Sequence, residues 1–299
     1  MLSIMLALNV LGLQAPPAPE RPTAHDRAFW KGIVEHDYAV PEGLSAATLI
    51  GELSTYLGSP DKELRDEFAY SIPVRWIYID KRLSPEELRR FLRMWSANLE
   101  SGLGEKGTDT VLLRSFSALD LSVLAALDLE RPFMTDAEFH GLLSEALLYL
   151  GKEADVRGYE ERVGWIHSAA HTADLLKFLS RNRALKAEDQ KGIVLGIEAR
   201  LQGAGSFFTH GEDERLARAL LSLVRRPDFD PAPLETWCER VKAAEAKLSD
   251  APVFDHDRFI AVQNQKSALK SLAVLLFAEK APTPQAKEVE KGLVALLAG

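Results

Sequence analysis

Apolar residues recur every three or four positions from residue 24 to the end of the chain, with polar residues between them. This spacing places the apolar side chains on one face of a helix, which turns about 100° per residue. Sustained alternation of apolar and polar residues, the usual sign of strands, is nearly absent. The pattern predicts helices over residues 24–37, 45–57, 60–80, 84–101, 109–128, 135–151, 160–181, 186–202, 211–225, 231–248, 256–278 and 284–298.

Helix-start signals support these ranges. Ser84 precedes Pro85 and stands three residues before Glu87, and Thr135 stands three residues before Glu138, which predicts a capping box at each helix start. Helices of about 15 residues joined by short polar turns form antiparallel pairs. A dozen of them without a strict sequence repeat predicts an all-α fold. We expect an irregular α-solenoid of HEAT- and armadillo-like stacked antiparallel helix pairs.

The chain divides into a short N-terminal segment and one long domain. Residues 1–23 combine an apolar run with a Pro-rich spacer. The run is too short to span a bilayer, which takes about 20 residues, and it resembles the apolar core of a secretory signal without the basic start. We therefore expect an exported, periplasmic protein, with a cytoplasmic protein as the alternative. Residues 24–299 form a single α-helical repeat domain, in which the Asp- and Pro-rich stretch 227–233 marks a minor break.

Composition narrows the function classes. The 299 residues are 46% apolar and 27% charged, as in an ordinary globular protein. The net charge of −8 and the lack of a Lys/Arg stripe between aromatic residues argue against nucleic-acid binding. Cys238 is the only cysteine, which excludes an intrachain disulfide and a thiolate metal cluster, and we interpret it as a packing residue. No phosphate-binding loop or nucleophile elbow is present.

The helix predicted over 160–181 carries the most informative polar residues. His167, His171 and Asp174 stand at i, i+4 and i+7 on one stripe of a largely apolar helix. Polar groups buried there need partners, and a hydrogen-bond network that fixes helix packing would supply them. The alternative is a site for a divalent metal such as zinc, held by these three residues in a metal-binding protein or metal-dependent hydrolase. Ser168 takes the place of the glutamate base of the helical metalloprotease motif, which excludes that mechanism.

Other polar residues extend this candidate site. Arg157 suits a carboxylate, either Asp174 or a glutamate, with a solvated surface arginine as the equal alternative. The indole N–H of Trp165 needs an acceptor. Glu212 belongs to the acidic first turn of the helix 211–225, and Arg215 can reach the preceding helix pair. We expect one buried polar cluster between adjacent repeats, formed by Arg157, Trp165, His167, His171, Asp174, Glu212 and Arg215.

Two further arginines and an asparagine suggest contacts between repeats. In helical repeat proteins an arginine on one helix often pairs with an aspartate of the neighbouring repeat, and we expect this of Arg65 and Arg114. Asn264 lies in the middle of a predicted helix, where we expect its side chain to bond to the previous repeat.

Several of these motifs together resemble a known family. From about Leu44 to Phe277 the chain is similar to the bacterial family called domain of unknown function 2785. The resemblance implies an all-helical protein and supplies no reaction. The motifs that carry it are Arg65-Asp66-x2-Ala69-Tyr70, Arg114-Ser115-Phe116-Ser117, Arg157-Gly158, Gly164-Trp165-x-His167-x3-His171-x-Ala173-Asp174 and Glu212-Asp213-Glu214-Arg215-Leu216-Ala217.

Stacked helix pairs present an extended surface that usually serves recognition. We therefore expect a non-enzymatic scaffold that binds a protein or peptide and needs no cofactor. A third hypothesis is a pH-responsive element, because two imidazoles in one buried stripe repel each other when both are protonated. Stability would then fall below about pH 6.

Overall fold

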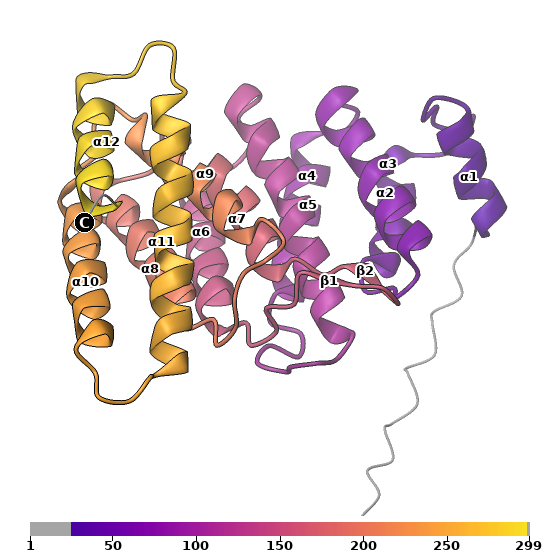
Figure 1. The fold of residues 1–299 in the computed structure, drawn as a ribbon. Coiled ribbons are helices and arrows are strands. Elements are labelled where there is room, and N and C mark those ends of the chain that lie inside the picture. The colour runs from indigo at the N-terminus through magenta and orange to yellow at the C-terminus, as the bar shows by residue number, and fades with distance from the viewer. Residues whose placement is uncertain (1–24, 298–299) are drawn as a thin grey trace, which may run out of the picture.

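The computed structural model describes residues 25–297, so the signal-like segment expected over residues 1–23 lies outside the described residues. The described part of the chain is helical apart from one two-stranded hairpin (Figure 1), and the expected all-α class is confirmed. Its α-helices are α1 (Arg27–Glu35), α2 (Ala46–Leu53), α3 (Ser71–Val74), α4 (Pro85–Asn98), α5 (Thr110–Glu130), α6 (Asp136–Lys152), α7 (Ser168–Leu179), α8 (Ala187–Gln202), α9 (Glu212–Val224), α10 (Ala232–Ser249), α11 (His256–Phe277) and α12 (Pro284–Leu297).

The range 60–80 is helical as predicted, but it is not one regular α-helix. It consists of the π-helices η2 (Glu63–Tyr70) and η3 (Arg75–Ile79), which flank α3. Pro73 lies inside α3 and has no backbone N–H to donate, so the regular hydrogen-bond pattern is interrupted there. A short 3₁₀ turn, η1 (Ser54–Tyr56), similarly extends α2.

The helices pack in two layers. Helices α5, α7, α9 and α11 lie side by side, and we call them the α5–α11 layer. Each of α4, α6, α8 and α10 packs against the helix that follows it, so these four form a second layer. In Figure 1 the chain progresses from α1 at one end of the molecule to α10, α11 and α12 at the other. In the described part of the chain, packing between helices one or two positions apart along the sequence therefore builds most of the fold.

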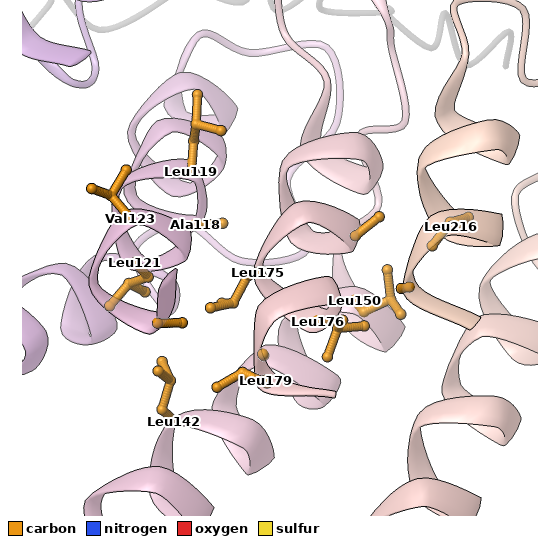
Figure 2. Close-up of a cluster of buried hydrophobic side chains, with 14 of the residues drawn as sticks. Ala118, Leu119, Leu121, Val123, Leu142, Leu150, Leu175, Leu176, Leu179 and Leu216 are labelled. Atoms are coloured by element: carbon orange, nitrogen blue, oxygen red, sulfur yellow. The ribbon is translucent and has the colours of Figure 1, made fainter. Parts of the chain in front are cut away.

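Helix α5 is the centre of the hydrophobic core. It is long and apolar enough to cross a membrane by length and composition, but 89% of its apolar window is buried inside the fold. Leucines of α5, α6 and α7 meet beside it, among them Leu121, Leu142 and Leu175, and Leu216 of α9 lies on the other side of α7 (Figure 2). The apolar character of α5 therefore fits a core helix that has neighbours on several sides.

The predicted capping boxes are present. Ser84 N donates to Glu87 Oε2 at 2.8 Å, and Glu87 N donates back to Ser84 Oγ at 3.3 Å. Thr135 and Glu138 repeat this exchange at 2.8 and 3.2 Å. These reciprocal bonds satisfy backbone groups that the first turns of α4 and α6 leave unpaired.

The predicted minor break at 227–233 covers most of the connection between α9 and α10 and the start of α10, and its Phe229 is buried. One hydrophobic cluster includes Val224 before the connection and Leu234 after it. Cys238, in α10, is buried as well, and burial raises the pKa of its thiol to about 11. A thiol that stays protonated is a poor nucleophile, in keeping with a packing role.

Candidate functional site

A hairpin precedes α7 and places the first residues of the site. Strand β1 (Tyr159–Glu160) pairs antiparallel with β2 (Gly164–Trp165). Gly164 has a φ of +77°, and a Cβ there would lie 2.8 Å from Lys62 Cδ. At Gly158, just before β1, a Cβ would lie 2.4 Å from Glu212 Oε1. Both positions therefore need glycine, the first for backbone conformation and close approach and the second for close approach alone.

The prediction of a continuous helix over 160–181 is wrong in its first half. Helix α7 begins at Ser168, and His167 is its N-cap residue with φ 49° and ψ 34°, in the left-handed region. The backbone reaches this conformation because Ile166 N donates to Gly158 O at 2.8 Å and His167 N donates to Arg157 O at 3.2 Å. The helical stripe thus contains only His171 and Asp174.

The two imidazoles nevertheless lie close together. Their ring centroids are 5.7 Å apart in an edge-to-face arrangement. Ser115 Oγ lies 2.8 Å from His171 Nδ1 and also donates to the carbonyl of Ile166. Since a hydroxyl has one proton, Ser115 accepts from His171, which must carry its proton on Nδ1. Burial lowers the pKa of His171 well below 6.5, so the ring is neutral at pH 7.

His167 lacks a hydrogen-bond partner at Nε2, although only 6% of the residue is exposed. Its Nε2 lies 3.7 Å from Oε1 of Glu212, the first residue of α9. Burial lowers the pKa of His167 to about 4, and the positive charge of Arg215 and the nearby His210 act in the same direction. The second oxygen of Glu212 accepts from His210 N at 2.8 Å.

Trp165 is not part of a buried cluster, contrary to expectation. It is 44% exposed, because β2 directs it to the surface of the hairpin. Its ring centroid lies 4.4 Å from that of His167 and 4.9 Å from that of Tyr159, which is also exposed. Trp165 therefore covers His167 from the solvent side.

Asp174 and Arg215 form a contact between α7 and α9. Arg215 Nη1 donates to Asp174 Oδ2, and Lys177 Nζ donates to Asp174 Oδ1 at 3.0 Å. Both oxygens of this carboxylate are thus engaged by cations. The expectation that Arg215 reaches the preceding helix pair is confirmed.

Arg157 binds locally and not to Asp174. Its Nη2 donates to Asp155 Oδ2 at 2.6 Å and its Nη1 donates to Glu160 Oε1 at 2.7 Å. Asp155 is fully buried two residues before Arg157, so the guanidinium meets this carboxylate first. Of the two expected partners, the structure shows a glutamate, together with an aspartate that we did not predict.

Two fully buried arginines hold the segment that leads into α7. Arg65 donates to the carbonyl of Val163 at 2.7 Å, and Arg114 makes a two-point contact with Glu153 at 2.6 and 3.1 Å. The prediction that both pair with an aspartate of a neighbouring repeat is wrong. The carboxylate bound by Arg65 is its own neighbour, Asp66, and that bound by Arg114 is a glutamate.

Asn264 makes its predicted contact with the previous part of the fold. Its Nδ2 donates to the carbonyl of Ser206 at 2.9 Å, and its Oδ1 accepts from Phe208 N at 3.1 Å. Both partners lie in the connection between α8 and α9. The side chain therefore ties α11 to that connection.

The alternative metal triad does not fit this geometry. His171 Nδ1 is engaged by Ser115, and Asp174 is engaged by Lys177 and Arg215. Within residues 25–297 no group of three or more His, Cys, Asp or Glu side chains is arranged to hold a metal ion. We therefore derive no metal chemistry from His167, His171 and Asp174.

The Asp174 cluster opens into a groove of about 340 Å³. The groove is lined by residues of α3, η2, η3, α5, α7 and α9, so it extends over three helices of the α5–α11 layer. Its apolar lining consists of Val74, Leu119, Val123, Ala126 and Phe178. Its polar lining consists of Tyr70, Tyr78, Ser122, Asp174, Lys177 and Arg215.

Two further side chains near the groove are uncharged at neutral pH. Asp120 is buried and neither carboxylate oxygen has a hydrogen-bond partner, so desolvation raises its pKa well above 3.8. Burial raises the pKa of Tyr70 to about 12, and the negative charge of Asp174 acts in the same direction.

Sequence reasoning missed Lys177, Asp120 and Glu153. Asp120 could have been found in the way that His171 was, since it is an acid in the middle of an apolar helix. Lys177 stands three residues after Asp174, a spacing that brings side chains together on a helix. Nothing in the local pattern distinguishes Glu153, because its partner Arg114 is 39 residues away.

The fold and site define an all-helical protein of two helix layers, with a polar cluster where α5, α7 and α9 meet. The family model of the proteins of unknown function DUF2785 matches residues 99–274, more than half of the chain. The chain therefore belongs to this family, as the motifs indicated. The match begins later than expected, so Arg65 and Tyr70 lie outside it. No curated protein and no solved structure matches the chain.

Proposed function

We propose that this protein is a non-enzymatic α-solenoid of the HEAT and armadillo type that binds a protein or peptide partner. Support for the solenoid comes from the helices, which alternate between two layers and pack against their sequence neighbours. The observation that carries the binding function is the groove of about 340 Å³ that extends over three helices of the α5–α11 layer.

The composition of the groove suits recognition of a chain segment. Recognition surfaces commonly combine an apolar centre with polar residues around it. Here Leu119, Val123 and Phe178 provide apolar contacts, while Asp174 and Arg215 provide charge and hydrogen bonds. The groove draws on several helices, so a bound segment would contact several parts of the fold at once.

The histidines favour a structural role over a catalytic one. His171 is neutral, and its Nδ1 proton is held by Ser115. His167 lies beneath Trp165, next to Glu212. Neither imidazole lines the groove. General base catalysis needs a base within hydrogen-bond reach of the proton it removes, and these rings are engaged or covered by the fold.

A pair of charge insertions tests the proposed function. Val74 lines the groove and is half-buried, whereas Leu148 is 42% exposed on α6, in the second layer. We expect Val74→Arg to abolish co-purification of a partner from native cells and Leu148→Arg to preserve it, with both variants melting near the parent temperature. Equal loss in both variants, or retention in both, would contradict binding through the groove.

A further inference from the structure

Lys177 and Arg215 line the groove near the end of α7, and Arg181 lies beside it, against Phe178 and a neighbouring pocket that Asp128 also lines. Lys177 Nζ lies 4.4 Å from the centroid of the Phe178 ring, and the Arg181 guanidinium lies 5.3 Å from it on the next turn. Arg215 reaches the same region from α9 through its contact with Asp174. Cations over an aromatic face are held in place while their remaining N–H groups stay available.

The positive charge of this cluster is not balanced. Lys177 and Arg215 share one carboxylate, that of Asp174. These three side chains together therefore carry one net positive charge. In the described part of the chain, Arg181 has no carboxylate within 4.0 Å, and its Nε donates to the hydroxyl of Ser222 at 3.0 Å.

Two other acidic groups near the groove, Glu130 and Asp120, do not neutralise this remaining positive charge. Glu130 accepts from Lys81 Nζ at 2.7 Å and from Tyr78 at 2.6 Å, so its charge is already neutralised. Asp120 is buried without a partner and stays protonated, because burial raises its pKa. The charged side chains that line the groove, Asp174, Lys177 and Arg215, therefore sum to one positive charge in a chain whose net charge is −8.

We propose that the groove binds a peptide segment in which an aspartate or glutamate side chain adjoins a leucine or phenylalanine. This inference rests on the proposed function and specifies its partner. The carboxylate of the segment would meet Lys177 and Arg181, and the apolar side chain would pack on Phe178 and Val123. Charge complementarity of this kind steers association and selects among partners more than it adds affinity.

The test uses an array of nine-residue synthetic peptides, acetylated and amidated so that only side chains carry charge. Each peptide has a central Asp, Asn or Lys followed by Leu or Phe, with neutral residues elsewhere. The strongest sequence is then titrated in its Asp, Asn and Lys forms by fluorescence anisotropy. We expect the Asp form to bind about threefold or more tightly than the Asn form, with a difference that shrinks at high salt.

Variants that remove a positive charge test whether these side chains cause the preference for the Asp form. Lys177→Ala and Arg181→Ala should weaken the Asp form and leave the Asn form unchanged. Lys191→Ala removes one positive charge from the exposed surface of α8 and should change neither.

The possible failures are distinguishable. Equal binding of the Asp and Asn forms, or preference for Lys, overturns the acidic partner while leaving peptide binding intact. Absence of binding to every peptide, or binding that Val74→Arg does not affect, overturns the proposed function together with this inference.

Discussion

At the scale of single residues, burial decides which side chains carry charge. His167 and His171 are neutral at pH 7 because the fold removes both rings from water. Asp120 is neutral for the same reason, with its pKa shifted in the opposite direction. The charged side chains that line the groove are Asp174, Lys177 and Arg215, which sum to one positive charge.

The histidines predict a pH-dependent stability. Their pKa values are below 6.5 in the folded state, so between pH 6.5 and about 4 the unfolded chain binds protons that the folded chain does not. The free energy of unfolding should therefore fall as pH decreases through this range, by on the order of 3 kcal/mol for His167 alone. Urea unfolding at pH 7.5 and 4.5 measures the loss.

His167→Asn is the control, because the amide does not titrate. Its free energy of unfolding should depend less on pH than that of the parent over the same interval. Carboxylates elsewhere are common to both proteins, so their contribution cancels in the comparison. A slope in the variant equal to that of the parent would show that His167 is not responsible.

Two glycine substitutions make a matched pair. A Cβ at Gly158 would lie 2.4 Å from Glu212 Oε1 and 2.6 Å from His210 Nδ1, so Gly158→Ala should cost about 1–3 kcal/mol. Gly141 lies inside α6 with nothing within 4 Å, so Gly141→Ala should stabilise by about 0.5–1 kcal/mol. Chemical denaturation compares them, and the same sign of change in both would contradict the close packing around Gly158.

At the scale of elements, the sequence predicted most helices well, but it did not predict the hairpin that precedes α7. Apolar spacing and capping residues are local signals, so the start of α4 at Ser84 follows from four adjacent residues. The hairpin before α7 depends on Gly158 and Gly164, whose close contacts come from Glu212 and Lys62. Such distant contacts leave no periodic trace in a single sequence, and two-residue strands are too short to show alternation.

The same distinction applies to the candidate site. The approach of Asp174 to Arg215 could be anticipated because each residue stands on a predicted helix, and helices that follow one another along the chain pack together. The exposure of Trp165 could not, because it depends on the hairpin that replaces the first turns of the expected helix.

The buried pair of Arg114 and Glu153 anchors the segment that enters α7. Arg114→Met should cost about 3–5 kcal/mol, because it leaves the buried carboxylate of Glu153 without its cation. It should also speed amide hydrogen exchange in residues 153–167. The double variant Arg114→Met, Glu153→Gln should recover part of the loss, whereas additive losses would show that the pair does not act as a unit.

At the scale of the whole molecule, stability depends on each helix being covered by its neighbours. Helix α5 packs against both α4 and α7, and its apolar face is fully covered only when both are present. The stability of each helix therefore depends on its interfaces with the neighbouring helices, and we do not expect parts of the fold to be stable by themselves.

Truncation tests this dependence. A chain ending at residue 156 retains α5 but lacks α7, so it should expose apolar surface, bind the dye ANS and elute as aggregates in size-exclusion chromatography. A chain ending at residue 225 keeps α5 and α7 together and should bind far less dye. A monomeric shorter fragment without dye binding would argue against the central role of the contact between α5 and α7.

Arg65 has a practical consequence for anyone who shortens this protein. It lies before the residues matched by the family, yet its guanidinium supports the carbonyl of Val163 at the hairpin. An expression fragment trimmed to the matched boundaries would lose this support, and with it Tyr70, Val74 and Tyr78, which line the groove. Ligand screens run on such a fragment would then sample a site that the intact protein does not present.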